Sequence, residues 1–191
     1  MSKKFDFSKI ERLESPQRKK LLPAEDILRQ YGLTEGMRVV DFGSGSGYFT
    51  FPAAKIVGSK GFVCGIDIDP EFVNYAKNRA KKENVKNVDF LTGDESSITV
   101  DSGSIDYILA GMTLHELKDI KKFFKEAKRV LKVDGRLLII EWQKRETPMG
   151  PPVSHRLSAA EISKAIENTG FKIRQEKEIN NMHYLLEIEK T

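Results

Sequence analysis

Cysteine and long apolar runs are both scarce in this chain. A single cysteine, Cys64, occurs among the 191 residues, and one thiol excludes an intrachain disulfide and a multi-thiolate metal site. No uninterrupted apolar stretch approaches the roughly 20 residues that a membrane helix needs. The first residues also lack the apolar core of a secretory signal. The expectation is therefore a cytoplasmic protein with no membrane span.

A dense basic cluster is also missing. The chain carries 32 Lys and Arg against 28 Asp and Glu, a net charge of +4, and its lysines are spread along the sequence. Nucleic-acid grooves usually show denser clustering. The richest stretches, 77–86 and 118–132, are interpreted as the solvated faces of amphipathic helices. The sequence therefore carries no strong nucleic-acid signal, and the composition indicates one globular domain over residues 1–191.

Short apolar runs alternate with amphipathic stretches from Met37 onward, which is typical of a parallel sheet covered by helices. The fold class predicted from this pattern is α/β. The last two apolar runs are joined by a short polar segment, which favours an antiparallel pair and hence a mixed sheet. Strands are expected at 38–42, 62–67, 88–91, 105–110, 136–142, 171–177 and 184–189.

Helix punctuation is clearest at three places. Asp69-Pro70 predicts the start of one helix. Apolar residues at helical spacing predict a second helix over 120–131, ending before a turn at Asp134-Gly135. Ser158 and Glu161 form a capping-box pattern that begins a third helix, for which Gly170 is the expected stop.

Two segments stand outside this alternation. Residues 1–36 carry one expected helix at 24–31 and are predicted to form an N-terminal helical cap. The Pro-rich loop 143–156 follows the strand that ends at Trp142, so it should leave the carboxyl edge of the sheet, where open α/β folds bind ligands. We therefore regard this loop as a lid candidate.

A glycine-rich segment, 43–47, lies between the first strand and the next helix, where glycines allow a tight turn and close approach of backbone N–H groups to a ligand. Its third glycine comes too early for G-x-G-x-x-G, and no Gly-Lys-Ser/Thr follows. Asp41 would repel a pyrophosphate but suits ammonium and sulfonium charges. Asp67 has the spacing of an acid that reaches ribose hydroxyls. These features favour S-adenosylmethionine (SAM).

A series of ordered segments strongly resembles the class I SAM-dependent methyltransferases, particularly the type 11 group that includes ubiquinone and menaquinone biosynthesis enzymes. The resemblance covers about residues 20–190 and implies a Rossmann-like, seven-stranded mixed sheet of order 3-2-1-4-5-7-6, the last strand antiparallel, with helices on both faces. Relatives often carry Pro-Gly-Gly where this chain has Val133-Asp134-Gly135. The matching segments are Val39–Gly47, Gly65–Asp69, Gly93-Asp94, Ile105–Tyr107, Leu114–Glu116 and Arg129–Gly135.

The resemblance also implies how the donor binds. SAM is the expected cofactor, S-adenosylhomocysteine the product, and no metal is expected. Carried over by position, the donor contacts are Asp41 at the methionine amino group, backbone groups of Gly43, Ser44 and Gly45, Asp67 at the ribose, Ile68 against adenine, Asp94 and Glu95 at its exocyclic amine, and the Ala110 carbonyl at the methionine ammonium.

Methyl transfer from a sulfonium is a direct displacement, so the protein mainly aligns the reactants and excludes water. A base is useful if the nucleophile must lose a proton. The resemblance sets His115 beside the transfer site, and Glu116 and the loop residue His155 are further candidate catalytic residues. His183 is expected to be structural. Arg12 and Arg18, in the N-terminal segment, could meet a carboxylate or substrate anion or could be solvated.

Missing motifs narrow the acceptor. No Asn/Asp-Pro-Pro-Tyr follows Ala110, which disfavours methylation of adenine or glutamine amino groups, and no Pro-Cys nucleophile is present. A lone cysteine does not supply the thiols of an arsenite methyltransferase. The expected partner is therefore a small-molecule acceptor. An RNA or protein methyltransferase and a noncatalytic SAM-binding module remain open alternatives.

Overall fold

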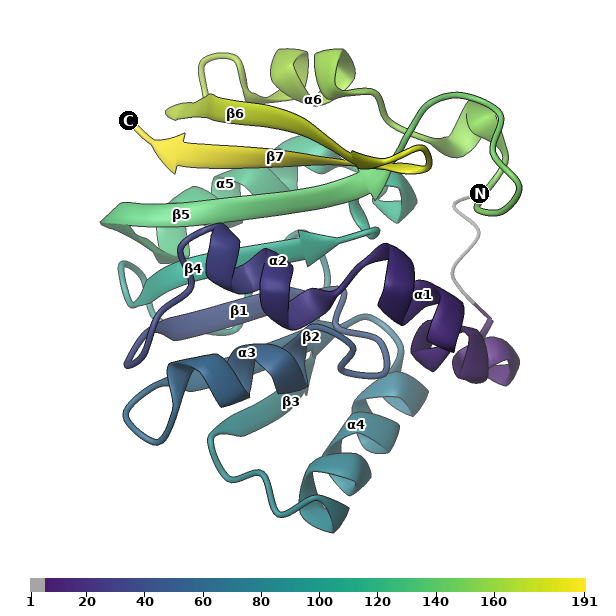
Figure 1. Cartoon of the computed structure of the whole chain (residues 1–191). Coiled ribbons are helices and arrows are strands. Elements are labelled where there is room, and N and C mark those ends of the chain that lie inside the picture. Colours follow the sequence, from purple (N-terminus) through teal and green to yellow (C-terminus); the bar gives the residue numbers. More distant parts are fainter. Residues whose placement is uncertain (1–5) are drawn as a thin grey trace.

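A seven-stranded sheet runs through the computed structural model, which describes residues 6–191 (Figure 1). The strand order is β3-β2-β1-β4-β5-β7-β6. Neighbours among β1 to β5 are parallel, and β7 is antiparallel to both β5 and β6. The predicted fold class and strand order are confirmed. The first five residues of the predicted N-terminal cap lie outside the described residues.

The elements follow one another in the alternation that the sequence indicates. The strands are β1 Arg38–Phe42, β2 Phe62–Asp67, β3 Val88–Thr92, β4 Ile105–Gly111, β5 Leu131–Trp142, β6 Phe171–Asn180 and β7 His183–Lys190. The α-helices are α1 Pro16–Leu21, α2 Ala24–Gln30, α3 Thr50–Val57, α4 Pro70–Lys82, α5 Ile120–Val130 and α6 Ala159–Ile166, and the 3₁₀ helices are η1 Phe7–Glu14, η2 Leu114–Glu116 and η3 Val153–His155.

Helices cover both faces of the sheet because both faces are apolar. Val39 packs in a cluster with residues of α2 and α3, whereas its neighbour Val40 packs in a second cluster with residues of α5 and α6. Successive residues of a strand point to opposite faces, so a strand buried on both sides reads as a continuous apolar run. Cys64 is buried in the second cluster, which agrees with its interpretation as a small hydrophobe.

Two boundaries differ from the predictions. β5 begins at Leu131, directly after α5, and Leu131 pairs with Ile105 before the register shifts. The predicted turn at 134–135 therefore lies inside the strand, as an irregularity that keeps Leu131 buried. Helix α6 ends at Ile166 rather than near Gly170, because Glu167 already has a non-helical ψ of 132° and Asn168 follows with a left-handed φ of 61°.

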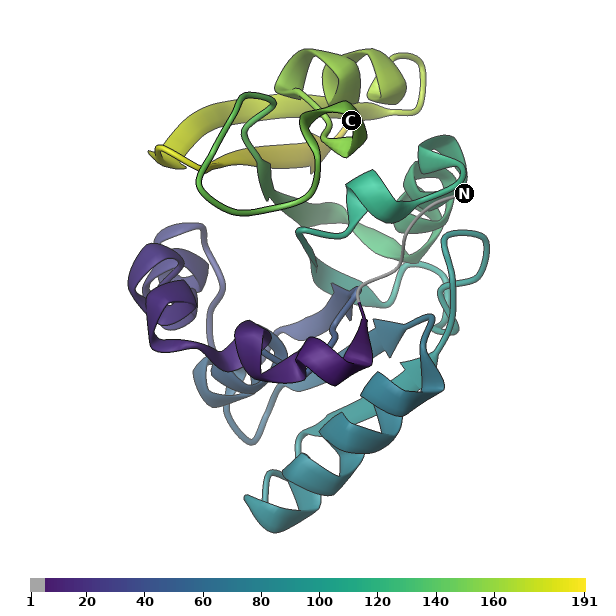
Figure 2. The ribbon, with the colours of Figure 1, turned by 90° about the vertical axis from the view of Figure 1, so that its right-hand side faces the viewer.

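The carboxyl ends of the parallel strands meet at one edge, seen face-on in Figure 2. The N-terminal segment, η1 and α1, lies on one side of this edge and the loop 143–156 on the other (Figure 2). Glu14 holds η1 against the glycine loop, because its carboxylate accepts hydrogen bonds from Ser46 Oγ at 2.7 Å and Arg79 Nη1 at 2.9 Å. Two separate parts of the chain thus flank the edge.

The loop 143–156 is folded around a buried cation. Arg156 is only 3% exposed, and its guanidinium donates to Thr147 Oγ1 and to four backbone carbonyl oxygens, those of Gln143, Arg145, Met149 and Pro151. Charge-assisted hydrogen bonds of this kind are stronger than neutral ones. The lid candidate is therefore an ordered loop with its own polar core.

Candidate active site

Asp41 is a buried acid at the end of β1. It is 2% exposed, and Thr50, the first residue of α3, donates its hydroxyl to Asp41 Oδ2 at 2.6 Å. Burial raises the pKa of Asp41 to about 7, and the negative charge of Asp67 acts in the same direction, whereas Arg18 opposes the shift. A cationic ligand group beside Asp41 would keep its carboxylate ionised.

The glycine loop is bonded to the end of the adjacent strand. The N–H groups of Gly43 and Ser44 both donate to the Ile66 carbonyl oxygen, at 2.7 and 3.0 Å, and the Gly45 N–H donates to Asp67 Oδ2 at 2.8 Å. The backbone donors that we expected to meet a ligand are therefore engaged inside the fold. The glycine loop can therefore offer a ligand close approach to its backbone and its carbonyl oxygens as acceptors.

Gly43 lacks a side chain for a steric reason. Its φ is +74°, and a Cβ at this position would collide with the Thr113 side chain. The glycine loop after β1 and the segment after β4 are therefore in direct contact, two residues before His115.

The remaining residues predicted to bind the methyl donor lie at or just after the ends of β2, β3 and β4. Asp67 accepts from the N–H groups of Gly45 and Asp69, which fixes its carboxylate at the edge. Ile68 beside it is 39% exposed, so its side chain offers an apolar surface against which a planar ring can pack. Hydrogen bonds from Ser96 lower the pKa of Asp94. Glu95 is half-buried and Ala110 is fully buried.

A histidine and a glutamate form a buried pair at the same edge. His115 Nδ1 lies 3.0 and 2.9 Å from the two carboxylate oxygens of Glu141, which is 0% exposed. The backbone N–H groups of His115 and Trp142 also donate to this carboxylate, at 3.2 and 3.1 Å. Because the carboxylate only accepts, it selects the tautomer of neutral His115 that carries its proton on Nδ1 and a lone pair on Nε2.

Glu141 was missed from the sequence, although a signal existed: it is the one acid in the apolar run 137–142. Burial alone would lower the pKa of His115, but the Glu141 carboxylate outweighs burial and raises this pKa above its ordinary value. Glu116 Oε1 lies 3.9 Å from His115 Nε2. His155 is exposed in η3 and does not take part in the pair.

His183, expected to be structural, lies at the start of β7 beside Trp142, with ring centroids 4.4 Å apart. Its Nδ1 bonds to Asn180 Oδ1 at 3.0 Å. Burial lowers the pKa of His183 to about 4, and the positive charges of Arg18 and Arg156 add to this effect. The ring is therefore neutral at physiological pH, and it forms part of the wall between the loop 143–156 and the N-terminal segment.

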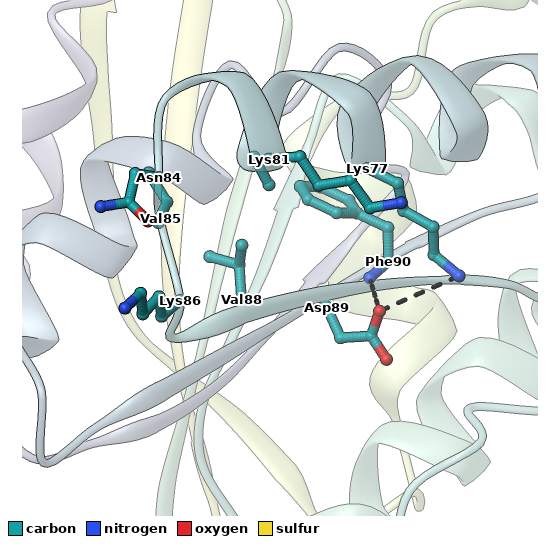
Figure 3. Close-up of a pocket in the computed structure, with 9 residues that line it drawn as sticks. Lys77, Lys81, Asn84, Val85, Lys86, Val88, Asp89 and Phe90 are labelled. Atoms are coloured by element: carbon teal, nitrogen blue, oxygen red, sulfur yellow. Dashed lines mark hydrogen bonds and ion pairs between the residues drawn. The ribbon is translucent and has the colours of Figure 1, made fainter.

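One surface hollow lies away from this edge. It measures about 480 Å³ and lies between the end of α4 and the start of β3, with Lys77, Lys81 and Asp89 among its lining residues (Figure 3). A second hollow of about 330 Å³ lies between the loop 143–156 and α6. Neither hollow contains a predicted site residue, so the hydrogen-bonded acids at the carboxyl edge define the candidate site.

Within residues 6–191, the structure contains no helix that is long and apolar enough to span a bilayer. The same residues contain no group of three or more His, Cys, Asp or Glu side chains that could hold a metal ion.

Known proteins share this arrangement. Residues 33–189 match the family model described as a methyltransferase domain. The chain belongs to this methyltransferase family. A crystal structure of a SAM-dependent methyltransferase from Aquifex aeolicus is 37% identical, with a TM-score of 0.94 over 98% of this chain and 100% of that one. The predicted class I resemblance is thus confirmed.

Curated relatives in the family include enzymes with different acceptors. A demethylmenaquinone methyltransferase from Lactococcus lactis is 33% identical over 136 residues, which are 71% of this chain and 54% of that protein. An arsenite methyltransferase from Halobacterium salinarum is 31% identical over 107 residues, which are 56% of this chain and 27% of that protein. The chain therefore spans about half or less of the length of these relatives.

The raised pKa of Asp41 predicts how stability depends on pH. Because burial favours the protonated acid, the free energy of unfolding of the ligand-free protein should fall as the pH rises from about 4 to about 8. Asp41→Asn keeps an acceptor for the Thr50 hydroxyl and removes this titration. In urea unfolding at about pH 8 we expect the variant to be more stable than wild type by about 1 kcal/mol or more, since one pKa unit is worth about 1.4 kcal/mol.

The exposed residue Asp134 supplies the control, since Asp134→Asn should leave the pH dependence unchanged. Parallel stability curves for wild type and Asp41→Asn would show that the Asp41 carboxyl is not the group that titrates.

Proposed function

We propose that this chain is a SAM-dependent methyltransferase that transfers a methyl group to a small-molecule acceptor. The observation that carries the proposal is the placement of Asp41 and Asp67 at the ends of adjacent strands, joined through the Gly45 N–H to Asp67 hydrogen bond, in a chain of the methyltransferase family. Two acids around a tight glycine loop suit a ligand that carries positive charge at one end and ribose hydroxyls at the other.

In the proposed donor complex, Asp41 binds the ammonium group and Asp67 the ribose hydroxyls. Its burial makes Asp41 a strong partner for a cation, because the charge is not screened by solvent. The exposed Ile68 side chain packs against the adenine ring. The other donor contacts of the proposal are Asp94 and Glu95 at the adenine amine, the Ala110 carbonyl at the ammonium, and close backbone approach at Gly43, Ser44 and Gly45.

The bound donor supplies an electrophilic methyl group on a sulfonium. The residues of this chain align it with the acceptor and exclude water from the edge. His115 removes the acceptor proton through the Nε2 lone pair, and Glu141 holds the ring and stabilises the imidazolium that forms. Glu116 and His155 stay secondary candidates in this scheme.

The proposed acceptor site is the edge between the N-terminal segment and the loop 143–156. The named substrates of the two curated relatives, demethylmenaquinone and arsenite, are not macromolecules, and the lysines of this chain are dispersed. The sequence predicts no particular acceptor and no number of copies, and the cytoplasmic location stays a prediction from the sequence.

Transfer of labelled methyl groups tests the proposed activity. The protein is incubated with methyl-labelled SAM and a cell extract that has been separated by size into metabolites and macromolecules. We expect label in the metabolite fraction only, and addition of S-adenosylhomocysteine should suppress it by competing for the donor site. Label in RNA or protein would favour an RNA or protein methyltransferase, whereas SAM binding without transfer into any fraction would favour a noncatalytic module.

The ribose assignment predicts a selective effect of Asp67→Ala. Loss of charge-assisted hydrogen bonds to the ribose should weaken S-adenosylhomocysteine binding by about tenfold or more, measured by calorimetric titration. Asp89→Ala, at the opposite end of the parallel strands, is the matched control and should bind normally. Unchanged affinity in Asp67→Ala would contradict the assignment.

The His115–Glu141 pair predicts a pH profile once an acceptor has been found. Removing the base with His115→Ala should lower kcat by about 10² to 10⁴. Wild-type kcat/KM should fall as the pH drops through the raised pKa of His115, because the protonated ring cannot act as a base. Glu141→Gln removes the charge that raises this pKa. The acid limb of the variant's kcat/KM profile should therefore move to lower pH.

Glu116→Gln is the control and should move this limb less, because Glu116 lies farther from the ring. An acid limb that stays in place in Glu141→Gln would exclude the pair as the titrating unit.

A further inference from the structure

His183, at the start of β7, has a buried ring nitrogen that forms no hydrogen bond. The side chain is 2% exposed, and within residues 6–191 its Nε2 atom has no hydrogen-bond partner. The other ring nitrogen, Nδ1, lies 3.0 Å from Asn180 Oδ1. A buried polar atom without a partner is costly and rare in folded proteins. The Nε2 atom of His183 is therefore a position at which a ligand group can complete the hydrogen bonding of the fold.

The Asn180 side chain fixes the tautomer of this ring. Asn180 Nδ2 donates to the Leu21 carbonyl oxygen at 2.7 Å, and Asn180 Oδ1 accepts from the backbone N–H groups of Met182 and His183 at 2.9 and 3.1 Å. These partners allow one orientation of the amide, with its oxygen toward the ring. Because an amide oxygen only accepts, the neutral ring carries its proton on Nδ1 and presents a lone pair at Nε2. The partner of Nε2 must therefore be an O–H or N–H donor.

The surroundings of His183 keep its ring neutral. Burial and the positive charges of Arg18, on α1, and Arg156, in the loop 143–156, lower its pKa to about 4. At His115 the opposite holds, because the Glu141 carboxylate outweighs burial and raises the pKa. The two histidines therefore differ in chemistry near neutral pH: His115 can take up a proton, whereas His183 can only accept a hydrogen bond.

His183 and the His115–Glu141 pair lie at the same end of the paired strands β5 and β7. In this ladder His183 is opposite Trp142, and Tyr184 is opposite Glu141. Successive residues of a strand point to opposite faces of a sheet. The Glu141 side chain, with His115, therefore lies on one face at this edge, and the stacked rings of Trp142 and His183 lie on the other. Both histidines border the edge at which we place the acceptor.

We infer that His183 Nε2 accepts a hydrogen bond from the methyl acceptor, which therefore carries a hydroxyl or N–H group besides the atom that is methylated. This inference rests on the proposed function and makes His183 a specificity-determining residue. An acceptor without such a group leaves the buried lone pair unpaired, and a polar site of this kind discriminates strongly against such analogues. Because Nε2 is buried, the acceptor reaches it only if α1 or the loop 143–156 shifts as it binds.

Two substitutions of His183 separate this role from a structural one. In His183→Asn the new amide nitrogen can replace Nδ1 as the donor to Asn180 Oδ1, and no atom replaces Nε2. The substrate is the purified metabolite that wild type labels from methyl-labelled SAM. We expect its KM to rise about tenfold in His183→Asn with kcat little changed, and calorimetry should show unchanged affinity for S-adenosylhomocysteine. His183→Gln, whose longer amide can place an oxygen near Nε2, should recover part of the loss.

Asn181→Ala, at an exposed position in the turn before His183, is the matched control and should keep the wild-type KM. An unchanged KM in His183→Asn would overturn the inference, and so would a labelled product without a hydroxyl or N–H group. A rise in KM together with an equal loss of S-adenosylhomocysteine affinity would show that the ring is only structural. If wild type labels no metabolite, the proposed function itself fails.

A second measurement needs no acceptor. In nitrogen NMR spectra of protein labelled with ¹⁵N in its histidines, the His183 signals are those that disappear in His183→Asn. Near neutral pH we expect these signals to report a neutral ring with its proton on Nδ1 and a bare Nε2. A ring protonated on Nε2 would overturn the inference whichever metabolite is the substrate, because Nε2 would then be a donor.

Discussion

The bond between the glycine loop and the end of β2 is the contact on which the candidate site depends. The backbone N–H groups of three successive residues, Gly43 to Gly45, donate hydrogen bonds to the Ile66 carbonyl oxygen and the Asp67 carboxylate. The loop after β1 is therefore fixed to the end of β2. This arrangement sets Asp67 at the edge and lets Thr113 pack directly on Gly43. The ends of β1, β2 and β4 are thereby brought into one rigid unit.

Buried charge is concentrated around that unit. Asp41, Glu141 and Arg156 are nearly inaccessible, and each would be costly in an apolar interior without polar partners. Glu141 and Arg156 have several hydrogen bonds each, whereas Arg18 Nε has none. The hydrogen bonds of Glu141 and Arg156 therefore offset the cost of burying these two charges.

The sequence predicted the fold well because strands that are buried on both faces are continuous apolar runs. Apolar runs such as 38–42 and 62–67 give the strands directly, and Asp69-Pro70 and Ser158 mark helix starts. It predicted the end of α6 and the start of β5 less well, since these depend on the backbone at Asn168 and on burial of Leu131. Glu141 escaped notice because its partner, His115, lies on another element and becomes adjacent only when β4 and β5 pair.

The sequence by itself determined the class of this protein, because the glycine loop, its two acids and the further segments that resemble the family are local features in a fixed order along the chain. Only the tertiary structure decided which polar groups are already satisfied. It showed that the loop N–H groups are used within the fold, that Glu141 fixes His115, and that Arg18 Nε is buried without a hydrogen-bond partner. Burial and pairing arise from contacts between distant segments, and spacing along one chain does not encode them.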